Sequence, residues 1–264
     1  MLPLVLDALT KSYGSKQAVA GLSLRVQPGE LFGLLGPNGS GKSTTLRMLC
    51  TLTEPSSGTA RIGEHDLTHL SAIRRAIAVV FQEPSLDPRL SARENLDLYL
   101  ALYRPLWDGT ERLRRCDEAL ARMGLSDRGA DLVSAYSWGM RRRLEIGRAL
   151  TTDPAVLLLD EPTTGLDPQS RYALWEHLTT LRRDRGLTVV VATHDMEEAE
   201  RCDRLAVLAE GRLAFCGPPD ELCSTTGENT LTRAFLALTG TALGTEGAAG
   251  PTLKGKDAAQ YRRS

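Results

Sequence analysis

Between positions 36 and 44, glycines are spaced around a lysine and hydroxyl side chains, a combination that can bind phosphate. The residues of this phosphate loop are Gly36, Pro37, Asn38, Gly39, Ser40, Gly41, Lys42, Ser43 and Thr44. The glycines let successive N–H groups point at an anion, Lys42 supplies positive charge for the β- and γ-phosphates, and the Ser43 hydroxyl can ligate Mg²⁺. A glycine-rich turn could match by chance, but the apolar strand before the loop and the helical stretch after it argue against this. The spacing therefore predicts a nucleoside triphosphate site.

A second candidate site lies where the apolar run 155–159 ends in two adjacent acids. Such continuous apolar runs are typical of a strand buried on both faces. Asp160 is placed to reach Mg²⁺, and Glu161 is placed to polarise an attacking water molecule. Adjacent acids can also mark a solvated strand end. Here they end an apolar run and precede Pro-Thr-Thr-Gly at 162–165, which favours the catalytic interpretation.

Further residues follow the order of motifs in a known family. They are Tyr13, Gln82, Ser137, Gly139, Asp167 and His194. Any one of them alone would be a packing or surface residue, so the information lies in their order together with the phosphate loop and the two acids. On these motifs, residues 1–225 resemble the ATP-binding subunit of ABC transporters. The resemblance implies ATP hydrolysis with Mg²⁺ and the ABC ATPase fold: an α/β P-loop NTPase (RecA-like) core with an antiparallel β subdomain and a helical subdomain.

The resemblance also implies roles for individual side chains around ATP. Tyr13 would stack on adenine, which its flat ring permits, the alternative being a core tyrosine. Gln82 would join Ser43 and Asp160 around Mg²⁺ and sense a membrane partner. The family places Gln82 among the catalytic residues.

The remaining catalytic residues implied by the family are Lys42, Glu161 and His194. His194 follows the apolar strand 188–193, and parallel α/β sheets hold their ligands at the carboxyl ends of the strands. Its imidazole could hydrogen-bond the γ-phosphate from there. Outside this context, a histidine at a strand end would be inert.

A composite site between two subunits is implied as well. By resemblance, Ser137 and Gly139 bind the γ-phosphate held by the opposite subunit, and Asp167 lies at the dimer interface. Asp167 followed by Pro168 also predicts the capped start of a helix, which is compatible with that role.

The segment 136–140, which we call the signature segment, departs from the family pattern. It is Tyr-Ser-Trp-Gly-Met where the family usually has Leu-Ser-Gly-Gly-Gln. Trp138 puts an indole where backbone normally approaches backbone closely. Either the ring turns outward and the site works, or the ring obstructs closure of the dimer.

Two stretches narrow the resemblance within the family. The run 141–143 is all arginine, which is typical of a solvated helix face. Together with the signature segment, however, this arginine run resembles the corresponding sequence in the daunorubicin-resistance type of drug and antibiotic exporter ATPase. The membrane partner of that type belongs to the ABC-2 class. Residues 233–240 are similar to the ending of that subfamily. We therefore expect export of a drug, antibiotic or other hydrophobic substrate, with an importer ATPase or a soluble ABC-type ATPase of cluster assembly or repair as alternatives.

Composition is consistent with an ATPase subunit at the cytoplasmic face of the membrane, soluble when isolated. A net charge of −1 shows no nucleic-acid footprint, so no nucleic-acid partner is expected. No apolar run approaches the roughly 18 residues of a membrane span. If the chain drives transport, another chain must supply the pathway. The resemblance implies that this is an integral membrane permease, and that a second ATP-binding subunit completes a homodimer. The five cysteines lack a Cys-x-x-Cys pair and are expected to be reduced thiols.

Periodicity and chain breakers divide the sequence into four parts. Residues 1–86 and 154–225 are expected to form the ATP-binding α/β core with its β subdomain, and 87–153 a helical subdomain carrying the signature segment. A C-terminal helix at 226–240 and a flexible tail at 241–264 follow. The strands expected in the core are 31–35, 58–62, 76–81, 155–159 and 188–193, and the main helices are 44–50, 92–103, 110–123, 139–150 and 168–185.

Overall fold

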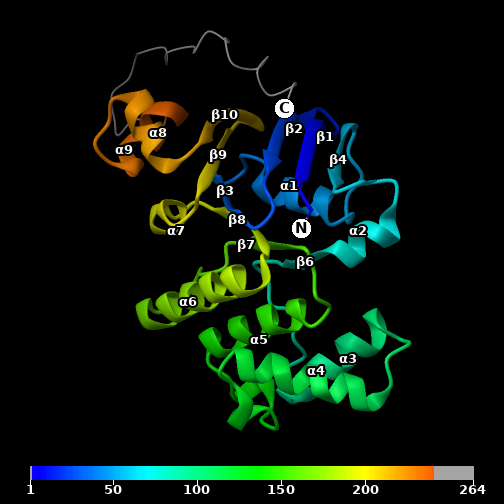
Figure 1. The fold of residues 1–264 in the computed structure, drawn as a ribbon. Coiled ribbons are helices and arrows are strands. Elements are labelled where there is room, and N and C mark those ends of the chain that lie inside the picture. The colour runs from blue at the N-terminus through cyan, green and yellow to red at the C-terminus, as the bar shows by residue number, and fades with distance from the viewer. Residues whose placement is uncertain (1, 241–264) are drawn as a thin grey trace.

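The computed structural model describes residues 2–240, and the predicted tail at 241–264 lies outside that range. The centre of the molecule is a six-stranded sheet in the order β10-β9-β3-β8-β7-β6, parallel except between β9 and β10 (Figure 1). The strands are β3 (Leu31–Leu35), β6 (Ile77–Val80), β7 (Val156–Asp160), β8 (Thr188–Thr193), β9 (Arg204–Ala209) and β10 (Arg212–Gly217). Every residue of β3, β7 and β8 is buried, which explains their nearly unbroken apolar sequences.

A second, four-stranded antiparallel sheet lies beside the first, in the order β2-β1-β4-β5. Its strands are β1 (Leu4–Tyr13), β2 (Lys16–Val26), β4 (Ser57–Ile62) and β5 (His65–Asp66). Side chains on β3 alternate between two cores because successive residues of a strand face opposite ways. Phe32 and Leu34 pack with the antiparallel sheet, whereas Leu31 and Leu35 pack in the core shared with the helices.

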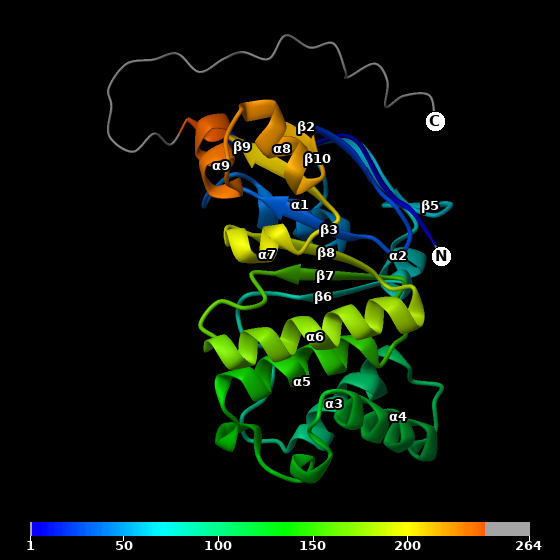
Figure 2. The ribbon, with the colours of Figure 1, turned by 60° about the vertical axis from the view of Figure 1, so that its left-hand side comes forward.

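Helices cover both faces of the central sheet. These are α1 (Lys42–Leu49), α2 (Leu70–Ala76), α6 (Pro168–Arg185), α7 (Met196–Glu200), α8 (Pro219–Thr226) and α9 (Leu231–Thr239). Figure 2 shows α6 running beneath β6 and β7, with α8 and α9 at the opposite end of the molecule. Asp167 caps α6 by accepting a hydrogen bond from the backbone N of Ser170, and Pro168 occupies the first turn, as the sequence predicts.

A helical layer inserted between β6 and β7 lies against α6, below the sheet in both views (Figures 1 and 2). Its elements are α3 (Ala92–Tyr103), α4 (Gly109–Arg122), the 3-10 turns η1 (Ser126–Arg128) and η2 (Val133–Ala135), and α5 (Trp138–Leu150). A capping box between Ser91 and Glu94 starts α3, which satisfies its first backbone donors. Leu96 and Leu100 of α3 share one buried core with Trp175 of α6, so the layer is packed onto the sheet rather than tethered to it.

Most expected elements are confirmed, several of them with bounds that differ by one or two residues, and the C-terminal helix differs by more. The strands at 31–35 and 188–193 and the helices at 92–103 and 168–185 have the expected bounds. The expected strand 76–81 is confirmed as β6, which is one residue shorter at each end (Ile77–Val80) because Ala76 ends the unforeseen helix α2. The expected C-terminal helix 226–240 is present but shorter: Gly227, whose φ is 75°, ends α8, and α9 spans only Leu231–Thr239. The phosphate-loop helix starts at Lys42, two residues earlier than expected.

Within residues 2–240, no helix is both long enough and apolar enough to cross a bilayer.

Candidate active site

The phosphate loop connects β3 to α1 at the carboxyl edge of the sheet. Its backbone leaves no room for side chains at two glycines. A Cβ on Gly36 would lie 2.5 Å from the carbonyl oxygen of Leu208, and one on Gly41 would lie 2.5 Å from that of Ala18. Gly41 also has a φ of 104°, which side-chain-bearing residues rarely adopt. The glycines of the loop are therefore structural requirements of its curvature.

Two polar groups in the loop are arranged as an anion would require. The side chain of Lys42 is buried, and its Nζ donates to the carbonyl oxygens of Gly36 at 2.8 Å and Pro37 at 3.2 Å. Burial lowers the pKa of Lys42, while the nearby carboxylates of Glu161 and Asp160 act in the opposite direction. The buried hydroxyl of Ser40 has no hydrogen-bond partner among the described residues. A phosphate in the loop would pair with both groups, so the residues present fit one.

Ser43 and Asp160 form the candidate magnesium site. The Ser43 hydroxyl donates to Oδ1 of Asp160 at 3.1 Å. Burial raises the pKa of Asp160, although the Ser43 hydrogen bond opposes this. No group of three or more His, Cys, Asp or Glu that could hold a metal occurs in the described part of the chain. Mg²⁺ is usually bound by one or two protein oxygens together with substrate phosphates and water, so the adjacent oxygens of Ser43 and Asp160 fit this ion.

Gln82 is exposed in the bend that follows β6. The parallel pairing of Val80 with Leu159 brings the ends of β6 and β7 side by side. Gln82 and the Asp160–Glu161 pair therefore leave the sheet at the same edge, as the implied role of Gln82 at the metal requires.

Glu161 and His194 are brought together from the ends of neighbouring strands. Nδ1 of His194 lies 2.9 Å from Oε1 of Glu161, and the Thr164 hydroxyl donates to Oε2 at 3.2 Å. Both carboxylate oxygens of Glu161 are thus held, and its side chain is only 12% exposed, against 52% for His194. The backbone of Glu161 has a φ of 47°, in the left-handed region. Non-glycine residues with this backbone conformation are often found at functional sites.

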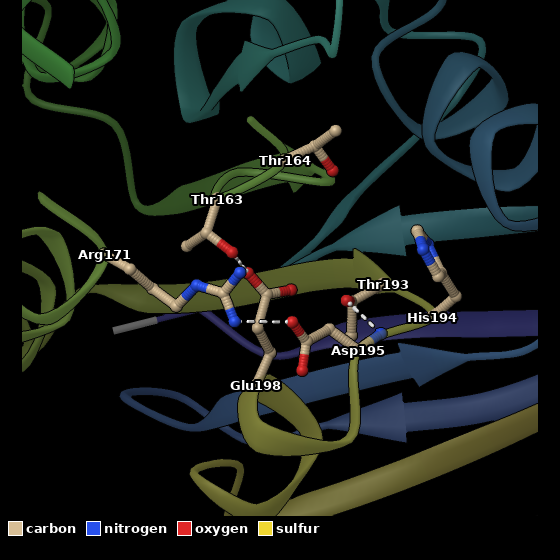
Figure 3. A pocket seen from close by; sticks show the side chains of 7 residues that line it. All are labelled: Thr163, Thr164, Arg171, Thr193, His194, Asp195 and Glu198. Carbon is tan, nitrogen blue, oxygen red and sulfur yellow. Dashed lines mark hydrogen bonds and ion pairs between the residues drawn. The ribbon is translucent and has the colours of Figure 1, made fainter. Parts of the chain in front are cut away.

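A pocket beside this pair contains three residues that the sequence does not single out (Figure 3). Arg171 bridges from α6 to Asp195, with 2.9 Å between Nη1 and Oδ2. Glu198 is buried, and Thr163 donates a hydrogen bond to its carboxylate. Burial raises the pKa of Glu198. A buried acid in a five-residue helix rich in surface acids carries no sequence signal, because its burial depends on distant segments.

The signature segment packs against the start of α6 in the same subunit. Ser137 is exposed and caps α5 by accepting from the backbone N of Met140 at 3.3 Å. Gly139 is buried, and a Cβ there would lie 2.6 Å from Oγ of Ser170. Among the described residues, no hydrogen bond joins this group to the phosphate loop.

Trp138 is 42% exposed, and its ring lies on the loop that follows Glu161. Its Nε1 donates to the carbonyl oxygen of Thr164 at 3.1 Å, and Gly165 lies beneath the ring. The indole therefore neither projects freely into solvent nor inserts into the phosphate loop of its own subunit.

The alternative interpretation of the arginine run 141–143 as a solvated helix face does not hold for Arg142, whose side chain is 5% exposed. It lies on the face of α5 that meets the sheet, where its charge is surrounded by backbone carbonyls.

Tyr13 ends β1 and is 50% exposed, so it is not a core tyrosine. Nζ of Lys11 lies 5.1 Å from the centre of its ring. The turn at Gly14 follows at once. The ring is accessible for stacking, and its contact with adenine stays a prediction.

The phosphate loop, the metal-binding pair and the held carboxylate define a P-loop ATPase of the α/β class. Residues 19–164 match the ABC transporter family. The chain belongs to this family and is an ATP-binding cassette with ATPase activity.

The relatives are similar over most of the chain. It is 47% identical to a Nod factor export ATP-binding protein of Paraburkholderia xenovorans, over 82% of this chain and 71% of that protein. It is 43% identical to a daunorubicin resistance ATP-binding protein of Streptomyces coeruleorubidus, over 85% of this chain and 71% of that protein.

Two solved structures are also similar to this chain. One is an ATP-binding subunit of an ABC transporter, with a TM-score of 0.79, 29% identity and coverage of 90% of this chain and 100% of the other. The second is a dimeric ATP-binding cassette bound to ADP and phosphate. It has a TM-score of 0.74 and 33% identity, and the match covers 81% of this chain and 98% of the other.

Proposed function

We propose that this chain hydrolyses ATP to drive export of a drug, antibiotic or other hydrophobic substrate through a separate membrane subunit. The observation that carries the catalytic part is the Glu161–His194 pair, held at the sheet edge that also carries Ser43 and Asp160. The relatives named for Nod factor export and daunorubicin resistance support the direction of transport.

ATP binding is assigned to the phosphate loop and Tyr13. Tyr13 stacks on the base, and Lys42 exchanges its contacts with the Gly36 and Pro37 carbonyls for the β- and γ-phosphates. Ser43, Gln82 and Asp160 hold Mg²⁺, which when bound neutralises charge on the phosphates.

Glu161 orients the attacking water and accepts its proton. Its two oxygens are fixed by His194 and Thr164, which limits the directions from which water can approach. His194 binds Glu161 through Nδ1, leaving Nε2 for the γ-phosphate. A histidine in this position can bind the carboxylate of Glu161 through one ring nitrogen and a phosphate oxygen through the other.

Two copies of the chain close head to tail around two ATP molecules. Ser137 at the start of α5 is exposed, as contact with a second subunit requires. Its hydroxyl and the backbone N–H groups of the first turn, with Gly139 among them, cap the γ-phosphate of the partner copy. Asp167 lies at the same interface, and the dimeric cassette among the similar structures supports this assembly.

The membrane subunit docks near Gln82 and along α3, at the cytoplasmic face of the membrane. Large apolar side chains are exposed on α3 and just after it: Leu98, Leu102, Tyr103 and Leu106. A group of this kind is typical of a surface that a partner covers. Movement of the partner can then be coupled to Gln82, which precedes α3 in the sequence and leaves the sheet at the same edge as Asp160.

The test is the turnover of MgATP by the purified chain as its concentration is raised. Specific activity that rises with concentration supports a composite site in a homodimer. Copurification of an integral membrane protein from detergent-solubilised membranes, lost on substituting Leu98 and Leu102 by serine, supports the docking surface. A chain that turns over ATP but captures only soluble proteins would contradict the transport proposal.

A further inference from the structure

We propose that Arg142 is a positioning residue, which holds the backbone of Glu161 in its left-handed conformation and joins it to the segment that carries Gln82. This inference rests on the proposed function, because it assumes that Glu161 orients the attacking water. Arg142 itself touches neither water nor nucleotide in this assignment.

The first contact group of Arg142 is the turn that contains Glu161. Its Nε donates to the carbonyl oxygen of Pro162 at 2.9 Å, and its Nη2 donates to those of Asp160 at 3.0 Å and Glu161 at 3.3 Å. Three successive carbonyls thus bind one guanidinium. Because its donors form a rigid planar fork, the group fixes the directions of these carbonyls as well as their distances.

This turn needs such support because of its backbone. Glu161 has a φ of 47°, which residues with a side chain rarely adopt and which persists only where surrounding contacts determine it. On the other side, the N–H of Glu161 donates to the carbonyl of Ala192 at 2.8 Å. Arg142 fixes the carbonyl side, so the peptide units on both sides of the Glu161 Cα are held.

The second contact group of Arg142 is the segment that follows β6. Its Nη1 donates to the carbonyl oxygen of Phe81, the residue before Gln82, at 2.6 Å. Glu145, one turn along α5, accepts from that same nitrogen at 3.2 Å and from the backbone N of Ser85 at 2.7 Å. One face of α5 therefore holds both ends of the five-residue stretch 81–85, which contains Gln82.

The chemistry of the site favours positioning over simple stability. A buried charge is weak support for a fold, since its desolvation offsets the contacts that it makes. Burial lowers the pKa of Arg142, against the opposing effect of Glu145. An apolar side chain could fill the space, but only a guanidinium has enough donors for four carbonyls and a carboxylate. Its contacts converge on the two segments that, in the proposed mechanism, contact the water and the metal.

The experiment compares Arg142→Lys with Arg143→Lys in the full chain. Lysine keeps the charge at position 142 but cannot reproduce the fork. Arg143 is the matched control, because it lies next along α5 and donates to the carbonyl of Met123 within the helical layer. For Arg142→Lys, we expect kcat to fall about 10- to 100-fold, the loss typical of a misplaced reacting group. The dissociation constant for a fluorescent ATP analogue and the KM should stay near the wild-type values. Equal kcat values for the two variants would overturn the inference.

A second measurement separates positioning from a structural role. In a Glu161→Gln background, ATP should produce a dimer on size-exclusion chromatography, and adding Arg142→Lys should leave that dimer intact. Loss of the dimer would assign Arg142 to folding or closure and overturn the inference. If Arg142→Lys does not fold, Glu145→Gln replaces it: this variant removes the carboxylate from the guanidinium, and an unchanged kcat would be contrary to the inference.

Failure of the proposed function is visible without any Arg142 variant. A wild-type chain that binds ATP without turnover, together with a Glu161→Gln variant that stays monomeric in ATP, would refute the composite site. The inference about Arg142 would then be refuted together with the composite site. A wild-type chain that turns over ATP, compared with an Arg142→Lys variant of equal kcat, would refute the inference alone.

Discussion

The indole nitrogen of Trp138 donates a hydrogen bond to the backbone carbonyl of Thr164, with 3.1 Å between the two atoms. This contact joins the first residue of α5 to the loop between Glu161 and α6. The family's usual glycine could not make it. The large side chain of the signature segment is therefore bound within its own subunit, and we predict that it leaves room for a second copy.

Trp138→Gly tests this directly. We expect no large rise in kcat, because the ring already lies along Gly165 and does not have to move for closure. Loss of a half-exposed hydrogen bond should cost about 0.5–1.5 kcal/mol in the free energy of unfolding, measured by urea denaturation. Trp138→Phe is the control, since it keeps an aromatic ring but cannot donate the hydrogen bond. A strong rise in turnover with glycine, but not with phenylalanine, would show that the ring obstructs the dimer.

Glu161→Gln should separate binding from turnover. The amide keeps an oxygen that can accept the Thr164 hydrogen bond but cannot accept a proton from water, so kcat should fall by about 10²- to 10⁴-fold. Affinity for ATP, measured by isothermal titration calorimetry, should remain. Hydrolysis at the wild-type rate would mean that another group activates water.

Two glycines of the phosphate loop offer a matched pair for stability. Gly39 and Gly41 both have a positive φ, but a Cβ at Gly39 meets no atom within 4 Å, whereas one at Gly41 would lie 2.5 Å from the Ala18 carbonyl. Gly41→Ala should therefore lose about 1–3 kcal/mol more free energy of unfolding than Gly39→Ala. Chemical denaturation of the two variants measures the difference. Equal losses would show that the loop shifts to accept the methyl group.

The buried carboxyl of Glu198 predicts a dependence of stability on pH. Burial raises its pKa above the ordinary value of 4.5. Between the unfolded and the folded pKa, the native state holds a proton that the unfolded state has lost, so its contribution to stability falls as pH rises through this window.

Glu198→Gln removes this titration, so its melting temperature relative to wild type should be higher at neutral pH than at about pH 4, where both states are protonated. Glu197→Gln is the control, because its side chain is 76% exposed and its ion pair with Arg171 contributes little. A difference between variant and wild type that is the same at both pH values would exclude this role for Glu198.

The sequence predicts best the features that depend on neighbours along the chain. Helix α6 has the expected bounds because Asp167 and Pro168 start it and Gly186, in the left-handed conformation, ends it. Asp160 at the end of β7, Glu161 after it and His194 after β8 are each predicted at strand ends, and the structure brings Glu161 and His194 within 2.9 Å of each other.

The features that the sequence does not predict depend on contacts between segments that are far apart in the chain. Arg142 belongs to a charge run, yet three of its partners are carbonyls about 20 residues later and another is at Phe81. The placement of the Trp138 ring likewise required the position of Thr164. Helix α2 has two arginines in its last turn and buries only Ile73. It therefore lacks the broad apolar face from which a helix is predicted.

The strand order of the central sheet has a consequence for synthesis of the protein. β3, which leads into the phosphate loop, lies between β8 and β9, and both of these come after the helical layer in the chain. When the ribosome has made the phosphate loop, neither β8 nor β9 has been made. The apolar strand β3 therefore keeps at least one unpaired edge until β9, which ends at Ala209, has emerged. Unpaired apolar strands are prone to aggregation, so we expect a nascent chain that stalls before this point to be vulnerable at Leu31–Leu35. The long insertion thereby delays completion of the sheet that carries the nucleotide site.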